Sequence, residues 1–363
     1  MKRMTPEEAK AFFTDLFILE LANNHWGNVE RGKQIIREHG KVAKDNGIKA
    51  AVKFQFRDID TFVKKEFEVD EAINREGEVV LPPGSSSRYV KKTIATRLSK
   101  EDFKVLLDET KKQGMFTMST PFDEKSVDLC DDFDLDLVKI SSHDASTRLL
   151  TKRIVELGRP TIVSDGGTDI SHIDYLVDLF EKKNVPLAIN HCVSLYPSED
   201  HELEIHQIDF LKKRYPNHVI GFSTHEYHDW NSSVMMAYAK GARTFERHVD
   251  IEDAEGTPVS KYCSLPHQVN EWFKAYNKAK EMCGSESDAP RKILEKEQTY
   301  VESVSRGMYA LRDIKKGTIL TEKDLGESYE LAIPLQENQV SAHDLNEDVV
   351  ATNDYKKGDP ITK

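Results

Sequence analysis

The sequence predicts an α/β protein with a (β/α)8 barrel and a small C-terminal β-rich domain. Eight short apolar runs alternate with stretches of helical period over about 280 residues, which is the count and size of such a barrel. Most of these runs are continuously apolar, as expected of parallel strands that are covered on both faces. After Cys283 the chain becomes polar and then changes to short β-rich segments, which indicates a second, smaller unit.

The predicted strands are taken in chain order, and helices are expected between them. Helical period is clear in 170–184 and 232–241, and Ser99 with Asp102 forms a capping box that should open another helix. A doubly wound open sheet is the alternative, but no Gly-x-Gly-x-x-Gly follows the first strand. The eight strands are expected at 16–22, 51–56, 115–120, 137–142, 160–165, 187–192, 219–224 and 243–249.

The connection after the second strand, 57–99, is unusually long and contains the Pro/Gly/Ser-rich stretch 82–87. In a barrel this connection lies on the face that carries active sites. It is expected to be either a substrate lid or a surface excursion, and the sequence leaves both open.

The predicted domains are a catalytic barrel at 1–285, a linker at 286–302 and a β-rich domain at 303–363. Two Lys-Lys-Gly turns, at 315–317 and 356–358, separate short apolar segments of the last domain. About 60 residues is near the lower limit for independent stability, so this domain is expected to lean on a partner surface.

Composition excludes several classes of function. The formal charge of −12 makes a nucleic-acid-binding protein a poor candidate. No apolar stretch approaches the roughly 20 residues that cross a bilayer, and the first residues lack the pattern of a secretory signal. The four scattered cysteines form no Cys-x-x-Cys pair and indicate reduced thiols. We therefore expect a cytoplasmic protein that contacts neither membrane nor nucleic acid.

Polar residues lie at or just after the end of nearly every predicted strand, which is where barrel enzymes place their active sites. Buried polar groups cost free energy unless they are paired, so this number of them indicates a site rather than packing. They are Glu20, Asn23, Asn24, His25, Lys53, Gln55, Ser119, Lys139, Ser141, Ser142, Ser164, Asp165, His191, Tyr196, His225, Glu246 and His248.

The first of two features that sharpen this prediction is a pair of lysines, Lys53 and Lys139, inside predicted strands. With Ser142 and Ser164 they would suit a phosphate group. The equally open alternative is that each lysine pairs with a carboxylate such as Glu20 or Glu246.

The second feature is a pair of histidines, His225 and His248, on adjacent final strands. Glu246 is two residues before His248, so both should project from the same side of the strand. Two imidazoles on neighbouring strands suit a divalent transition metal with open positions, which we favour over two core histidines.

Seven short motifs follow one another along the barrel part of the chain. They are Glu20–Gly27 (ELANNHWG), Val52–Gln55 (VKFQ), Ser119–Asp123 (STPFD), Lys139–Ser142 (KISS), His191–Pro197 (HCVSLYP), Gly221–His225 (GFSTH) and Phe245–His248 (FERH). In this order they resemble the motifs of the sialic acid synthase (N-acetylneuraminate or nonulosonic acid synthase) family. The segment 303–325 is similar to the antifreeze-like (SAF, β-clip-like) domain that ends these synthases.

The resemblance implies a TIM barrel enzyme that condenses phosphoenolpyruvate with the aldehyde of an open-chain hexosamine. It implies a divalent metal, typically manganese, with magnesium or cobalt as alternatives, and a homodimer in which each SAF domain caps the other barrel. Carried over residue by residue, the metal ligands would be His225 and His248, and the phosphoenolpyruvate-binding residues Lys53, Lys139, Ser142 and Ser164. Glu20 would transfer a proton, and Gln55, Tyr196 and Glu246 would orient sugar or water.

The chain departs from the family pattern at places that bear on the sugar. Thr224 and Arg247 replace the central residues of the family's SDH and EKH motifs, and Ser194 stands where many members have Asn. Of the family motif that follows the eighth strand, this chain keeps only Ser264-Leu265-Pro266. The small domain has SYELAIPLQENQ in place of an Arg-Pro-Gly segment whose arginine contacts the N-acetyl group. The departures favour an aldose with different substituents from N-acetylmannosamine.

Three other functions stay open at the level of sequence. A Schiff-base aldolase would use Lys53 or Lys139 as nucleophile without metal. A metal-dependent hydrolase would need a His-x-His pair at the first strand, which here ends in Glu20 and Asn-Asn-His. A catalytically retired sugar-binding barrel would share the fold without the activity.

Overall fold

The computed structural model describes residues 4–63, 92–285, 289–345 and 348–363. Contacts within the chain divide it into two units, Met1–Gly284 and Ser285–Lys363. Most of the 57–99 connection, for which the sequence leaves a substrate lid and a surface excursion open, falls on 64–91 and lies outside the described residues.

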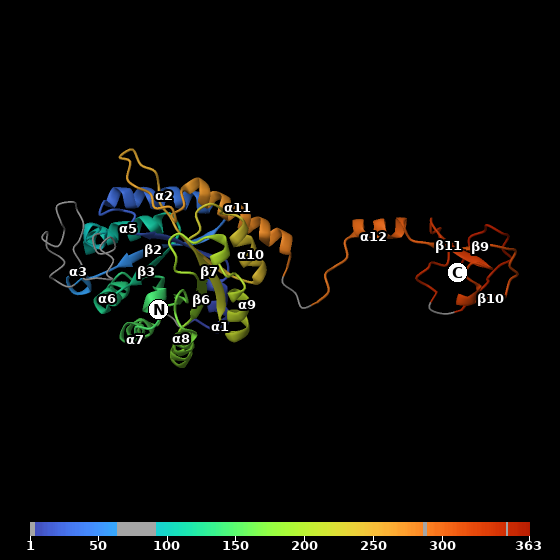
Figure 1. The fold of residues 1–363 in the computed structure, drawn as a ribbon, viewed down its shortest axis with the longest axis horizontal. Coiled ribbons are helices and arrows are strands. Elements are labelled where there is room, and N and C mark those ends of the chain that lie inside the picture. The colour runs from blue at the N-terminus through green and yellow to red at the C-terminus, as the bar shows by residue number, and fades with distance from the viewer. Residues whose placement is uncertain (1–3, 64–91, 286–288, 346–347) are drawn as a thin grey trace. The chain divides into compact units, whose positions relative to one another are not determined.

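The first unit is a closed barrel of eight parallel strands, which confirms the predicted fold (Figure 1). Each strand pairs with the next, and β1 also pairs with β8 to close the barrel. Three of the predicted strands have the predicted bounds, and the others differ by one or two residues at one or both ends. The strands are β1 (Leu16–Ala22), β2 (Lys49–Phe56), β3 (Phe116–Pro121), β4 (Leu137–Ile140), β5 (Thr161–Ser164), β6 (Leu187–Cys192), β7 (Val219–Thr224) and β8 (Thr244–His248).

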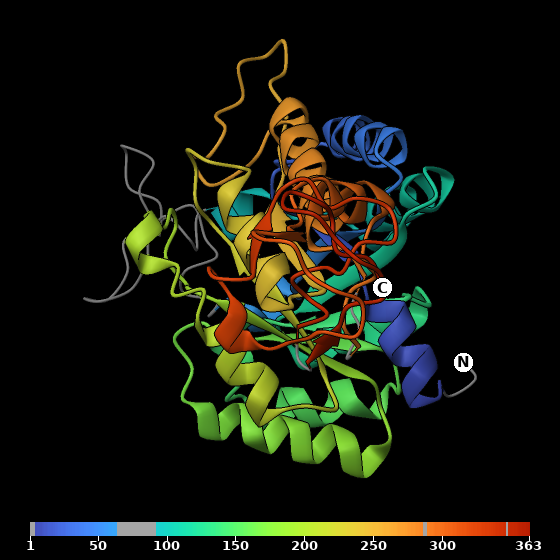
Figure 2. The same cartoon turned by 90° about the vertical axis from the view of Figure 1, so that its right-hand side faces the viewer.

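Helices alternate with the strands and cover the barrel from outside (Figures 1 and 2). The expected capping box is present at the start of α5, where Ser99 and Asp102 bond each other's backbone N–H groups. The helices are α1 (Pro6–Phe13), α2 (Val29–Asp45), α3 (Ile59–Phe62), α5 (Lys100–Lys112), α6 (Glu124–Asp132), α7 (Arg148–Glu156), α8 (Ile170–Lys183), α9 (Gln207–Arg214), α10 (Ser232–Lys240) and α11 (Pro266–Cys283).

The fourth strand is shorter than predicted. It was expected to reach residue 142, but β4 ends at Ile140 and the 3-10 turn η3 (Ser142–Asp144) follows. The Ser141 hydroxyl donates to the Asp144 carboxylate over 2.7 Å, and the Asp144 N–H donates to the Ser141 carbonyl. This local bonding offers the backbone an alternative to the sheet ladder, and it turns the chain at the mouth of the barrel.

Two apolar layers hold the barrel. The outer layer lies between strands and helices, where the Phe17 ring packs 4.8 Å from Trp272 and 4.9 Å from Phe245. The inner layer fills the N-terminal half of the barrel and includes Phe13 of α1 and Ile18. The interior is therefore closed by apolar side chains at one end, which leaves its polar residues at the C-terminal ends of the strands.

The second unit contains α12 (Glu295–Ser303), the antiparallel pair β9 (Gly307–Ala310) and β11 (Tyr329–Ala332), and the antiparallel pair β10 (Ile319–Leu320) and β12 (Val349–Val350). Its own core includes Met308, Leu320 and Tyr329. The two Lys-Lys-Gly turns place Gly317 and Gly358 at φ of 83° and 93°, a region that glycine enters without strain. Part of the segment predicted as a linker forms α12, which buries none of its residues.

Within the described parts of the chain, no helix is both long and apolar enough to cross a membrane.

Candidate active site

All ten side chains that the sequence singles out for chemistry line the same cavity, which has a volume of about 1110 Å³. It lies at the C-terminal ends of the barrel strands, the end that the inner apolar layer leaves open. The cavity is lined by residues from all eight strands or the loops that follow them, and the ten come from every strand except β3. The ten are Glu20, Lys53, Gln55, Lys139, Ser142, Ser164, Tyr196, His225, Glu246 and His248.

The cavity floor holds a buried chain of charged groups. The β1–β2 register pairs Glu20 with Lys53, and the β1–β8 register pairs Glu20 with His248. The Lys53 ammonium lies 2.6 Å from Glu20 Oε2 and 2.7 Å from Glu246 Oε1. Lys139 Nζ is 3.8 Å from the same Glu246 oxygen. The carboxylate pairing that the sequence left open is therefore present for Lys53.

Burial and charge pull the pKa values of this floor in opposite directions. Burial lowers the pKa of Lys53 to about 8, although the Glu246 carboxylate opposes that shift. Burial alone would raise the pKa of Glu246, but the ammonium groups of Lys139 and Lys53 lower it to about 2. Glu246 is therefore ionised at neutral pH, and Lys53 can change its charge near physiological pH.

One wall of the cavity can receive an anion. Lys139 Nζ donates to Ser164 Oγ over 2.7 Å. The backbone of Gly166 comes so close that a Cβ there would lie 2.4 Å from Ser194 Oγ and 3.0 Å from Ser142 Oγ. A cation and several hydroxyls that converge on a small space suit a phosphate or carboxylate group.

His225 and His248 lie side by side, with ring centroids 5.5 Å apart. His225 Nδ1 lies 3.1 Å from the Val193 carbonyl, which fixes Nδ1 as the donor and leaves Nε2 unprotonated. His248 Nδ1 is buried and has no hydrogen-bond partner. Burial lowers the pKa of His225 to about 4 and that of His248 well below 6.5.

These two imidazoles fit a divalent metal. Both are neutral at pH 7, as a metal ligand must be, and one has a buried nitrogen that no group among the described residues satisfies. Among the described residues, no group of three His, Cys, Asp or Glu side chains is placed to hold a metal ion. Within the described parts of the chain, the two imidazoles are therefore an open donor set that leaves coordination positions to water and substrate.

Several cavity residues escaped prediction from the sequence. Arg57 lies two and four residues after Gln55 and Lys53, so the period of two along the strand could have found it. Its guanidinium donates to Gln55 Oε1 and lies 3.8 Å from the Phe122 ring centroid. Tyr262 comes from the loop after β8, where no periodicity marks it, and its ring lies 5.1 Å from that of His248.

Other strand-end residues that the sequence grouped with the site do not line the cavity. Asn24 donates to the Val249 carbonyl and holds the loop after β8. His191 Nε2 contacts the Leu203 carbonyl, also outside the cavity. Asn24 is a satisfied buried polar group rather than a site residue. His191 Nδ1 is buried, lies 3.5 Å from Asp165 Oδ1 and has no hydrogen-bond partner among the described residues. His25, Ser119 and Asp165 do not line the cavity either.

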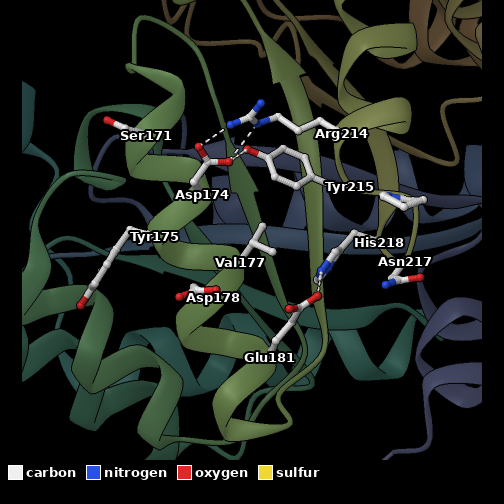
Figure 3. Close-up of a pocket in the computed structure, with 11 residues that line it drawn as sticks. Ser171, Asp174, Tyr175, Val177, Asp178, Glu181, Arg214, Tyr215, Asn217 and His218 are labelled. Carbon is white, nitrogen blue, oxygen red and sulfur yellow. Dashed lines mark hydrogen bonds and ion pairs between the residues drawn. The ribbon is translucent and has the colours of Figure 1, made fainter.

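A second hollow, shown in Figure 3, lies between α8 and the loop that enters β7. Its main polar groups are paired with one another. Arg214 and Tyr215 both donate to Asp174, and His218 Nε2 lies 3.0 Å from Glu181. This hollow of about 640 Å³ is at the opposite end of β7 from His225 and shares no lining residue with the candidate site.

The sequence model of the NeuB family matches residues 41–288, which is more than half of the chain. An N,N'-diacetyllegionaminic acid synthase from Campylobacter jejuni is 27% identical over 95% of this chain and 98% of its own length. A pseudaminic acid synthase from the same species is 25% identical over 85% of each chain. A solved structure from Chromobacterium violaceum, described as spore coat polysaccharide biosynthesis protein E, has a TM-score of 0.84 at 31% identity and covers 96% of this chain and 98% of that one.

Proposed function

The chain belongs to the NeuB family, and from this premise we propose that it is a nonulosonic acid synthase that condenses phosphoenolpyruvate with an open-chain aldose, in the hexosamine class. The methylene carbon of phosphoenolpyruvate forms a C–C bond with the aldehyde carbon, and water adds to the pyruvyl C2. Loss of phosphate from the resulting tetrahedral carbon gives a 3-deoxy-2-ulosonic acid. The observation that carries the proposal is that ten residues, chosen for this chemistry between Glu20 and His248 of the sequence, line one cavity.

Phosphoenolpyruvate would bind against the wall formed by Lys139, Ser142 and Ser164, with Lys53 at its inner end. Each ammonium has three donors. Lys53 donates one to Glu246 and forms an ion pair with Glu20, so donor capacity is left for the anion. Glu20 and Glu246 hold the Lys53 ammonium in place before substrate arrives, and Ser142 and Ser164 add neutral donors around the phosphate.

Proton transfer and orientation fall to the carboxylates and their neighbours. Glu20 would take or give a proton at the forming centre, because it lies beside both Lys53 and the His248 strand position. Gln55 donates to Glu20 Oε1 over 3.2 Å and would orient the aldose. Glu246, which is held ionised, would orient the attacking water, and Tyr196 would cover the aldehyde end from its place 4.0 Å from the His225 ring.

His225 and His248 would hold a divalent cation, with manganese the first candidate and magnesium or cobalt the others. When bound, such a cation polarises a carbonyl oxygen as a Lewis acid. Other coordination positions would be left to water and substrates, since the described residues offer no three-residue cluster.

The oligomeric state and the cellular location that we propose follow the family. The chain would act as a homodimer in which the second unit of one protomer caps the barrel of the other. It would work in the cytoplasm on small molecules.

The test is phosphate release from phosphoenolpyruvate with a panel of hexoses, N-acetylated hexosamines and diacetamido sugars, with manganese or with EDTA. Aldose-dependent release that is lost with EDTA, with His225→Ala and with His248→Ala is expected. His218→Ala, in the second hollow, is the matched control and should keep full activity. If the protein binds neither manganese nor phosphoenolpyruvate, the synthase proposal is wrong.

A Schiff-base aldolase is a second candidate because the pKa of Lys53 is lowered to about 8 by burial, as a nucleophilic lysine requires. Borohydride trapping of a carbonyl substrate, lost in Lys53→Arg, would reveal it. The contact of Lys53 with two carboxylates favours a cation over a free amine, so we expect no trapping.

A further inference from the structure

A fully buried ion pair lies behind the two histidines. Arg247 is 0% exposed and its partner Glu226 is 1% exposed, and their charged atoms are 2.8 Å apart. Arg247 directly precedes His248, and Glu226 directly follows His225. Because side chains alternate along a strand, Arg247 points away from the cavity that Glu246 and His248 line, and it is not among the lining residues.

The pair connects three segments of chain. Arg247 donates from Nη1 to the Glu226 carboxylate and from Nη2 to the Glu226 carbonyl, while Nε donates to Ser264 Oγ over 2.8 Å. Trp230 Nε1 donates to the same hydroxyl. The β8 strand, the loop after β7 and the start of α11 are therefore joined at one guanidinium.

These bonds reach the backbone of His248 and of the residue that follows His225. Ser264, held by Arg247, donates its N–H to the His248 carbonyl over 2.8 Å. The Glu226 carbonyl, also held by Arg247, belongs to the residue after His225. His248 has no hydrogen bond at Nδ1, so on that side its ring orientation depends on its backbone and on packing.

Stability alone does not account for this pair. Two buried charges lose their hydration, and apolar residues of similar size are often as stable or more so. The geometry of a planar guanidinium with five fixed donors, in contrast, specifies distances and angles between the groups it bonds. A lysine or a methionine could fill the space but could not reproduce these bonds.

We propose that Arg247 and Glu226 are positioning residues that set the separation and orientation of His225 and His248 for a divalent cation. The inference rests on the proposed function, because the metal role of the two histidines comes from there. Neither residue would touch the cation or the substrates.

The experiment measures manganese binding to the full chain without substrates, by the EPR signal of the free ion. The variants are Glu226→Gln and Arg247→Lys, which keep size but lose bonding, and phosphoenolpyruvate binding is measured on the same samples. The expected result is a manganese dissociation constant at least tenfold higher in each variant, with phosphoenolpyruvate affinity changed less than twofold.

Arg159→Lys is the matched control, because Arg159 is also buried and bonds Asp131, Asp134 and the Leu135 carbonyl. It should lower the melting temperature by a similar amount and leave manganese affinity unchanged. If a variant fails to fold, the double variant Arg247→Met with Glu226→Met removes both charges together, and its folded form should still bind manganese weakly.

The outcomes separate the two proposals. Unchanged manganese affinity in folded Glu226→Gln and Arg247→Lys, with wild-type binding that needs His225, overturns the positioning role and leaves the proposed function standing. Wild-type protein that binds no manganese, or binds it equally without His225, overturns the metal part of the proposed function and this inference with it.

Discussion

Replacing Lys53 by methionine tests how the buried charges of the cavity floor are balanced. Lys53 lies within 2.7 Å of both Glu20 and Glu246, and these carboxylates are 1% and 5% exposed. After the change, Glu246 keeps Lys139 at 3.8 Å, whereas Glu20 keeps the Gln55 amide at 3.2 Å. Glu20 therefore becomes a buried carboxylate without an ion-pair partner among these groups.

The expected loss in free energy of unfolding is about 3–5 kcal/mol at neutral pH, the usual cost of removing one partner of a buried pair. Lys139→Met is the control, because Lys53 still neutralises Glu246 in that variant. It should cost about 1 kcal/mol, close to the value of its hydrogen bond to Ser164. Lys53→Met combined with Glu20→Gln should regain more than half of the loss, since it removes the stranded charge.

The assay is urea unfolding followed by tryptophan fluorescence. All three tryptophans, at positions 26, 230 and 272, lie in the barrel unit, so the signal reports that unit. The lowered pKa of Glu246 contributes stability above its ordinary pKa of 4.5, and this contribution is lost as the pH falls toward 2. The difference between wild type and Lys53→Met should therefore shrink below about pH 4.5.

Two results would refute this reasoning. One is a Lys53→Met loss no larger than that of Lys139→Met, which would mean that the carboxylates are solvated or protonated. The other is no recovery in the double variant, which would mean that packing rather than charge sets the loss.

Three further predictions follow from single positions. Gly166→Ala should weaken phosphoenolpyruvate binding at least tenfold in calorimetry, because its Cβ would lie 2.4 Å from Ser194 Oγ; unchanged affinity would place the anion elsewhere. Burial lowers the pKa of His39 to about 4, so the free energy of unfolding is unaffected by this group above about pH 6.5 and falls by about 2 kcal/mol at pH 5. His39→Gln should remove this fall from the plot of unfolding free energy against pH. A plot for the variant that runs parallel to that of the wild type would contradict this. Trp272→Ala should cost about 3–5 kcal/mol in urea unfolding, since the ring is 1% exposed against Phe17; a loss under about 1 kcal/mol would show that the core collapses into the space.

Much of the fold could be predicted from the sequence because strand and helix periods are local properties. The runs 16–22, 187–192 and 219–224 match the observed strands at both ends. The fourth strand was predicted two residues too long. It ends where the Ser141 hydroxyl bonds the Asp144 carboxylate, and the pattern of apolar residues does not predict such a bond. Residues 64–91 lie outside the described part of the chain, so the choice between a lid and a surface excursion stays open.

The sequence by itself determined which residue types stand at the ends of the barrel strands. That was enough to choose ten residues that line one cavity, because parallel strands in a closed barrel all end on the same side. It also carried the motifs by which the chain resembles its family.

Only the tertiary structure decided how those residues meet. Lys53 and Glu246 are 193 positions apart, and no local pattern states that one ammonium lies between Glu246 and Glu20. The same holds for the pairing of Arg247 with Glu226 behind the histidines. The physical reason is that strand register and side-chain packing are set by contacts between distant segments, whereas periodicity along the chain reports only which face of its own element a residue occupies.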